Sequence, residues 1–359
     1  MINKRNALFF NKEYMDNILE KIITERKIEE AGRLDAIKIV NSLFSELMDR
    51  ERDILTRRFG LSGDKYETLE KIGSLHKLTR ERVRQIEAAS IKKIKKLDNL
   101  SNYIDDLKVT VHRLLEDHGG LIRRDYLLDI LTVLTLELNM DKSEMAGDEK
   151  VRRAYRNHFN FLISNLMVDD LEIINKSEKF TPIFKLRNNE VSYLEELADN
   201  ILEKIDNSQR TFSTEELISL SKQLDIFNKN QDKIVKETIN IVPILKSKTF
   251  PDKAEIINSN KVLYSLMQAI KNLERNKFGK WGLADWKEIK PKTVNDKIYL
   301  ILKNEGEPMH FTTIAEKINE VKFDNKKANA ATVHNELILD ERYILVSRGT
   351  YALKEWKNE

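Results

Sequence analysis

The stretch TRERVRQIE, at residues 79–87, gathers side chains that can recognise nucleic-acid bases. In the major groove of DNA, arginine can donate two hydrogen bonds to guanine, glutamine can pair with adenine, and glutamate can accept from cytosine. Residues three or four apart on a helix lie on the same face. A helix that begins with this stretch therefore has one polar face, formed by Arg80, Glu81, Arg84, Gln85 and, farther along, Lys92, and the residues near its start could read bases.

Positive charge continues beyond this face. The segment from Lys77 to Lys96 is the densest basic cluster of the chain and contains only two acidic residues. We expect its last lysines, from Lys92 onward, to hold DNA phosphates, which fix the position of a protein on DNA but carry no sequence information. The net charge of the whole chain is only +3, so any nucleic-acid footprint must be local.

A reading helix needs neighbouring elements that hold it at a steep angle. Thr68 and Thr79 are suitable N-caps for a short helix followed by a longer one. Gly73 would let the two helices approach, and Val83 and Ile86 would bury one side of the second. A solvated, ion-paired face is the alternative for the second helix alone, but the complete helix-turn-helix spacing favours DNA contact.

The composition indicates a helix-rich cytoplasmic protein with several domains. The chain has 359 residues, 34% charged and 41% hydrophobic, with only 11 glycines and 5 prolines. The absence of cysteine excludes disulfides, thiolate zinc sites and cysteine nucleophiles, and fits a reducing cytoplasm. Apolar runs are too short for a membrane span, and the six histidines form no metal motif. We expect no enzymatic activity, metal, cofactor or membrane contact.

Hydrophobic periodicity predicts a mainly α-helical fold with small β-hairpins. Three stretches after the helix-turn-helix repeat the order helix, short helix, long helix and strand pair, which is the winged-helix plan. The best linker is KEIKPK at 287–292, because a proline disfavours helix in the preceding residue. The predicted domains are an N-terminal helical segment at 1–40, the helix-turn-helix at 41–100, and winged helices at 106–188, 191–288 and 292–357.

Residues 47–97, LMDRERDILTRRFGLSGDKYETLEKIGSLHKLTRERVRQIEAASIKKIKKL, strongly resemble region four of the housekeeping bacterial sigma factors. The resemblance implies contact with a promoter −35 element in double-stranded DNA. The base-reading residues of that family fall on Arg80, Glu81 and Gln85. Its phosphate contacts fall on Thr79, Arg82, Arg84 and Lys92, and the charge of the helix adds Lys95.

The same resemblance implies a second partner, the flap-tip helix of the β subunit in core RNA polymerase. The family binds this helix in an apolar cup, which here falls on the helix of residues 44–59 and the start of the next. An alternative occupant of the cup is the N-terminal helix of this chain, residues 1–35, through Ile18, Ile22 and Ile28. The residues expected to bind polymerase are Leu43, Leu47, Ile54, Leu55 and Phe59.

The sequence departs from the family pattern in three places. His76 stands where the family usually has an aromatic core residue, and we expect it to be a partly buried packing residue. Ala89 replaces a lysine on the DNA side, which suggests weaker or altered DNA binding. The aromatic cluster with which a sigma factor melts DNA has no counterpart, since the tryptophans are Trp281, Trp286 and Trp356. We therefore expect that the chain is not a complete sigma factor.

The C-terminal segment resembles the HARE-type helix-turn-helix, a module of the polymerase delta subunit, restriction enzymes and chromatin regulators. GEPMHFTTIAEKI at 306–318 and RGTYAL at 348–353 carry this resemblance. In a winged helix the third helix, here near 328–339, would face DNA. The sequence leaves two roles for this helix, contact with DNA and contact with another protein. Its residues that could contact DNA are polar but hardly basic: Asn329, Thr332, His334 and Asn335.

These features predict a non-enzymatic bacterial transcription regulator that binds DNA through a sigma-like module and extends its contacts with winged helices. One alternative is the DNA-recognition component of a restriction or defence system whose catalysis lies on another polypeptide. Another is a polymerase-binding protein that no longer reads DNA. A methylase or nuclease gene beside this one would favour the restriction alternative.

Overall fold

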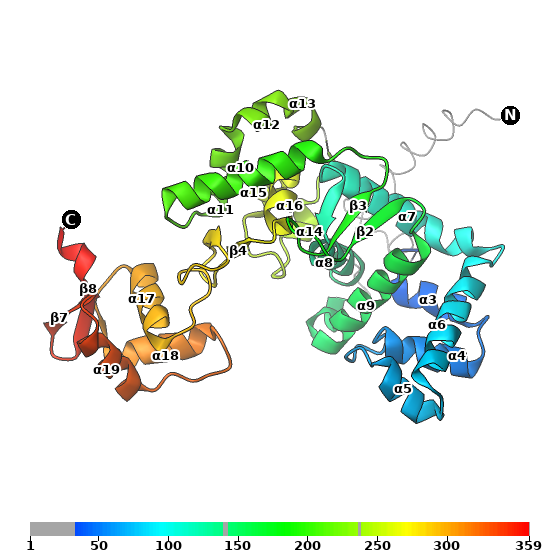
Figure 1. Cartoon of the computed structure of the whole chain (residues 1–359), viewed down its shortest axis with the longest axis horizontal. Helices are drawn as coiled ribbons and strands as arrows, with labels where there is room; N and C mark the ends of the chain where they lie inside the picture. Colours follow the sequence, from blue (N-terminus) through cyan, green and yellow to red (C-terminus); the bar gives the residue numbers. More distant parts are fainter. Residues whose placement is uncertain (1–32, 139–142, 236–237, 359) are drawn as a thin grey trace. The chain divides into compact units, whose positions relative to one another are not determined.

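The computed structural model describes residues 33–138, 143–235 and 238–358. Most of the predicted N-terminal segment, with Ile18, Ile22 and Ile28, lies outside these residues. The described chain is mainly helical, with small antiparallel sheets of two or three strands, as the periodicity predicted (Figure 1). No helix in the described ranges has the length and apolar character that crossing a membrane requires.

The chain forms two compact units, which we describe separately. The first contains the described residues up to Glu195 together with Asp225–Ala269. The second contains Glu196–Leu224 and the described residues from Ile270 onward. The predicted domain at 191–288 contributes residues to both units, and its boundaries, like those of the other four domains, stay a prediction.

The first unit begins with a helical module whose small core is made of Ile54, Ile72 and Val83, all fully buried. Each of these residues comes from a different helix, so the core fixes the mutual angles of three short elements. Leu69, Leu78 and Ile86 pack around it. The helices of this module are α3 (Ala36–Phe44), α4 (Asp49–Arg58), α5 (Leu69–His76) and α6 (Arg80–Lys95).

A winged helix follows in the same unit. Its sheet has the order β1-β3-β2 and is antiparallel, with Leu121 opposite Lys185 and Ile173 opposite Phe184. The sequence pattern predicted the hairpin and the helices, and the structure adds the short first strand. The elements are α7 (Leu100–Asp117), β1 (Leu121–Arg123), α8 (Arg124–Leu136), η1 (Ser143–Gly147), α9 (Glu149–Leu166), β2 (Leu171–Ile174) and β3 (Ile183–Leu186).

Helix α16 (Lys261–Ala269) packs against β1 of this winged helix. The hydroxyl of Ser265 donates to the carbonyl of Leu121 at 2.8 Å, and eight of the nine α16 residues are buried. This helix is therefore used inside the unit and has no free face. The short helices before it are α12 (Asp225–Lys229), α13 (Gln231–Ile234), α14 (Val242–Leu245) and α15 (Ala254–Ser259).

The second unit ends in another winged helix. Its sheet has the order β6-β8-β7, so the first strand again pairs with the last. Ile298, Ile314 and Val333, one from each helix, form its core with Leu353 of the sheet. The elements are α17 (Val294–Glu305), β6 (Met309–His310), α18 (Phe311–Val321), α19 (Ala330–Leu339), β7 (Tyr343–Ser347), β8 (Thr350–Leu353) and η2 (Lys354–Asn358).

The other part of the second unit is built around a buried tryptophan. Trp281 is 2% exposed, and its indole N–H donates to the hydroxyl of Thr214 at 2.9 Å. Its backbone pairs with Phe212, so this side chain packs inside the fold and does not form a stacking surface. The elements are α10 (Ser192–Ser208), of which the residues from Glu196 belong here, α11 (Thr214–Lys222), β4 (Leu273–Arg275) and β5 (Trp281–Leu283).

Candidate nucleic-acid interface

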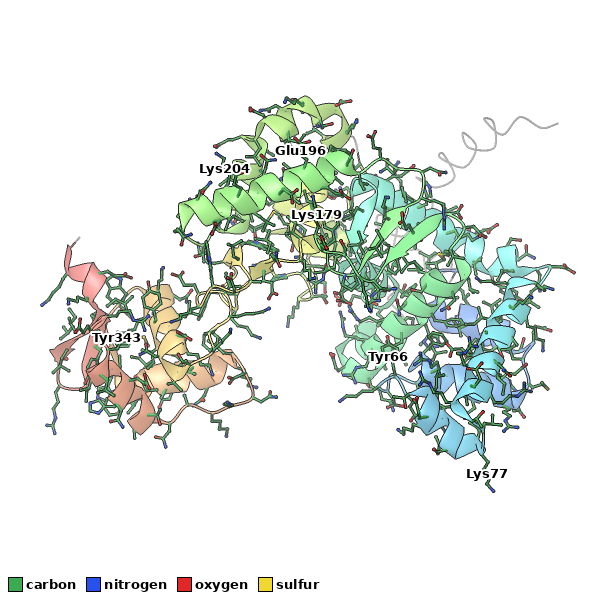
Figure 2. All side chains as sticks on the ribbon, viewed as in Figure 1. Tyr66, Lys77, Lys179, Glu196, Lys204 and Tyr343 are labelled. Carbon is green, nitrogen blue, oxygen red and sulfur yellow. The ribbon has the colours of Figure 1, made fainter. Side chains whose placement is uncertain are left out.

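The turn between α5 and α6 sets the direction of α6. Lys77 ends α5 in a left-handed backbone conformation (φ 55°), and Figure 2 labels it at the tip of the module. The N–H of Leu78 then donates to the carbonyl of Gly73 at 2.9 Å. A Cβ at position 73 would lie 2.7 Å from the carbonyl oxygen of Leu78, so this close approach requires glycine.

Both helices of the motif begin at a threonine cap. The hydroxyl of Thr68 accepts from the N–H of Lys71 at 3.3 Å, and that of Thr79 accepts from the N–H of Arg82 at 3.2 Å. Such caps satisfy backbone donors that the first helical turn leaves without a partner. The caps predicted from the sequence are therefore present, and they define where α5 and α6 start.

All eight residues expected to bind DNA are exposed. Within the protein, the three arginines of this face are held by acceptors on the same surface. Arg80 pairs with Glu70 of α5 at 3.0 Å, and Arg84 forms a two-pronged pair with Glu81 at 2.6 and 2.8 Å. The guanidinium group of Arg82 donates to the side-chain oxygen of Gln85 at 3.2 Å.

These pairs keep the acidic residues of the face ionised. The hydrogen bond from Arg84 lowers the pKa of Glu81, and the charge of Arg80 acts in the same direction. A carboxylate that stays charged repels DNA phosphates and suits only a base that offers a donor, such as cytosine. The face thus carries exposed lysines at Lys92 and Lys95 and a charged carboxylate near the start of the helix.

Contacts from α4 brace the reading helix from behind. Arg58 pairs with Glu87 at 3.3 Å and also donates to the backbone carbonyl of Glu67. Glu51 and Lys93 approach to 3.7 Å. These side chains therefore join α4 to α6 and to the loop before α5.

His76 is partly buried, with 18% of its side chain exposed, as the sequence predicted. Its Nε2 lies 2.7 Å from a carboxylate oxygen of Asp53, and Arg57 binds the same carboxylate at 2.8 Å. Burial raises the pKa of Asp53, but the hydrogen bonds from Arg57 and His76 outweigh burial and lower it. The residue that replaces an aromatic ring therefore joins α5 to α4 through a polar contact.

The module with the braced helix α6, the glycine-dependent turn and the basic exposed face matches a known family. Residues 43–96 match the family Sigma-70, region 4. RNA polymerase sigma factor SigA of Lactococcus lactis subsp. cremoris is 35% identical over 82 residues, which are 23% of this chain and 22% of that protein. RNA polymerase sigma factor SigA1 of Synechococcus elongatus is 46% identical over 56 residues, 16% of this chain and 14% of the relative.

The chain thus spans less than a quarter of the length of these sigma factors. Residues 292–356 match a second family, HARE-HTH, a helix-turn-helix domain whose description names ASXL and restriction endonucleases. No solved structure matches the chain. Both resemblances read from the sequence are confirmed, and both families are DNA-binding modules.

The apolar surface of the sigma region-four module is covered in this structure. Of the five residues expected to bind polymerase, Phe59 is partly exposed and the other four are at most 5% exposed: Leu43, Leu47, Ile54 and Leu55. Ile54 belongs to the core of the module itself. On the side of the module that faces α9, Phe161 of α9 contacts the rings of Phe44 and Phe59.

Sequence reasoning missed three residues that shape this site. Glu70 holds Arg80, and a carboxylate ten residues before an arginine gives no periodic signal that would reveal the pair. Phe161 and Asn157 reach the module from α9, about a hundred residues along the chain, so only the tertiary structure brings them there.

In the HARE-type module, the third helix is α19. Asn329 caps it, with its side chain accepting from the N–H of Ala331 at 2.9 Å. Thr332 and Asn335 are exposed, while His334 is partly covered and its ring lies 4.5 Å from that of Phe311. Two of the four named residues therefore have structural contacts of their own. In the described parts of the chain, no His, Asp or Glu cluster could hold a metal ion.

Proposed function

We propose that this protein is a DNA-binding transcription regulator whose sigma region-four module reads promoter −35-type DNA. One observation carries the proposal: all eight implied contact residues are exposed on an α6 helix that is capped and braced from behind. Arg80, Glu81 and Gln85 would read bases near the start of the helix. Phosphates would be held by Thr79, Arg82, Arg84, Lys92 and Lys95.

Binding would require an exchange of partners on this face. Arg82 and Arg84 now pair with Gln85 and Glu81, and both pairs are solvent-exposed. Exposed ion pairs contribute only about 0–1 kcal/mol, so DNA can displace them at small cost. The released Glu81 and Gln85 then become available to base edges. These pairs therefore hold the side chains of the face in place without preventing DNA binding.

A second part of the proposal concerns RNA polymerase. The relatives are RNA polymerase sigma factors by name, and the sequence resemblance implies that the apolar surface of α3 and α4 takes the β flap-tip helix. Such helix-in-groove contacts depend on a few apolar anchors. We propose this helix as the polymerase partner, reached when the surface is uncovered.

The name of the second family supports an alternative role. A helix-turn-helix matched to restriction endonucleases would suit the DNA-recognition component of a restriction or defence system, with catalysis on another polypeptide. A nuclease or methylase encoded beside this protein, and copurifying with it, would favour this role over transcription regulation.

Selection of duplexes from a random library by the full chain tests the main proposal. We expect enrichment of a short element like a promoter −35 sequence. A variant with Arg80, Glu81 and Gln85 all changed to alanine keeps the phosphate contacts and should bind without enrichment. If the unchanged protein enriches no sequence, or the variant enriches the same one, the proposed reading role is wrong.

A further inference from the structure

Helix α9 covers the apolar side of the sigma region-four module, within the first unit. Phe161 of α9 is 1% exposed and packs edge-on against two rings of the module. The centroid distances are 5.6 Å to Phe44 and 4.9 Å to Phe59. Phe161 of α9 therefore contacts both α3 and the end of α4, the place that the sigma resemblance assigns to a partner helix.

Beside this aromatic contact, two hydrogen bonds join Asn157 of α9 to the loop after α4. The side-chain amide of Asn157 donates to the carbonyl of Gly60 at 2.7 Å, and its oxygen accepts from the hydroxyl of Tyr66 at 3.0 Å. Figure 2 labels Tyr66 at this edge of the module. A Cβ at Gly63 would lie 2.4 Å from the backbone oxygen of Lys150. The loop after α4 is thus shaped to meet α9 closely.

The contact has one strong part and one weak part. Phe161 is fully enclosed, whereas Tyr66 is 55% exposed and the nearby Asp64–Lys150 pair, at 3.6 Å, has side chains more than 60% exposed. Exposed polar contacts are easily exchanged with water. Opening would also break the buried hydrogen bond from the hydroxyl of Tyr155 to Asp35 at the start of α3, at 3.2 Å, so the ring of Phe161 is one part of a wider buried contact that a partner helix with apolar anchors would have to replace.

The position of α9 in its own domain adds a second consequence. It is the third helix of its winged helix, the element that this fold commonly places in the major groove. The residues of α9 that contact the module are buried: Tyr155, Asn157 and Phe161. While α9 covers the module, this winged helix cannot present these residues to DNA, and the reading face of α6 remains open.

We propose that α9 is an internal occupant of the polymerase-binding surface, so that the protein reads DNA in a closed state and binds the flap-tip helix only after α9 leaves. This inference rests on the polymerase contact of the proposed function. The apparent affinity for the flap helix equals the intrinsic affinity multiplied by the open fraction. Substitutions that weaken the α9 contact must therefore raise flap affinity, and they must leave DNA affinity unchanged.

The test uses the full chain and a fluorescent peptide of the flap-tip helix, with binding measured by anisotropy. Tyr66→Phe removes one largely exposed hydrogen bond and should strengthen binding only slightly, by about twofold. Phe161→Ala removes the enclosed ring and should strengthen it roughly tenfold or more. Phe184→Ala is the matched control, because it removes an equally buried ring from β3 of the same winged helix.

The opposite change locks the contact. The chain has no cysteine, so Asp64→Cys with Lys150→Cys provides a unique pair of thiols. A short thiol cross-linker between them would join the loop after α4 to the start of α9. The cross-linked protein should lose flap binding, and cleavage of a reducible cross-linker should restore it. DNA affinity, measured on the same samples, should not change.

Two results would overturn the inference. One is equal flap affinity in locked and unlocked protein. The other is a failure of both Phe161→Ala and Tyr66→Phe to exceed the Phe184→Ala control, including the case in which no variant binds the peptide. Sequence-selective DNA binding is measured separately, so its presence in the same samples would keep the reading role while the α9 inference falls.

Discussion

Replacing Arg80 with alanine separates base reading from simple charge attraction. Arg80 is 71% exposed as a side chain, and its pair with Glu70 is an exposed one. Its removal should therefore change the free energy of unfolding by no more than about 0.5 kcal/mol. A lost base contact costs about 1–3 kcal/mol, which is roughly a 5- to 150-fold loss of affinity for the preferred duplex.

The assay is anisotropy with the selected duplex and a scrambled duplex, over a series of salt concentrations. Arg80→Ala should weaken the selected duplex far more than the scrambled one. Lys92→Ala is the matched control, since it removes the same charge from the far part of the same face. It should weaken both duplexes alike and lower the salt slope by about one unit. Equal losses on both duplexes for Arg80→Ala would refute the assignment of Arg80 as a base reader.

Three further outcomes are expected. Gly73→Ala should lower the free energy of unfolding of the first unit by about 1–3 kcal/mol, because the new Cβ lies 2.7 Å from the Leu78 carbonyl oxygen. Urea unfolding measures this, and an unchanged urea midpoint would contradict the turn geometry. Thr79→Ala should cost about 1 kcal/mol of stability through the lost cap, and Thr79→Ser should restore it, as measured by thermal melting. Burial lowers the pKa of His118 to about 3, so between about pH 6.5 and pH 3 the folded state binds fewer protons than the unfolded state, and the free energy of unfolding decreases as the pH is lowered. His118→Gln should reduce this pH dependence in unfolding measurements between pH 7 and pH 5, and an identical pH dependence would argue against a neutral buried imidazole.

Local features of the reading module could be predicted from the sequence because they depend on residues close together in the chain. Helix caps act within one turn, at Thr68 and Thr79, and the approach at Gly73 joins residues five apart. The apolar spacing of Val83 and Ile86 fixes which side of α6 is buried, and therefore which side is exposed. The exposed polar face followed from that periodicity without any knowledge of the rest of the fold.

The order of elements in the winged helices was also accessible, because helical and alternating periods differ. The short strand β1 was not, since three residues between two helices carry no period of their own. Its pairing with β3 joins Ile122 to Phe184, about sixty residues later. Strands of this kind form only when a partner strand supplies their hydrogen bonds.

The state of the apolar surface was decided by the tertiary structure alone. The sequence indicated that Leu43, Leu47 and Leu55 would form an apolar surface, because they recur at helical spacing. The hydrophobic pattern shows that this face must be covered, but it does not show which element covers it. The hydrophobic effect has no directional preference and so selects no particular partner. The alternative occupant within the chain, the predicted helix of residues 1–35, lies almost wholly outside the described residues. The structure covers the surface with α9, through Phe161 and Asn157.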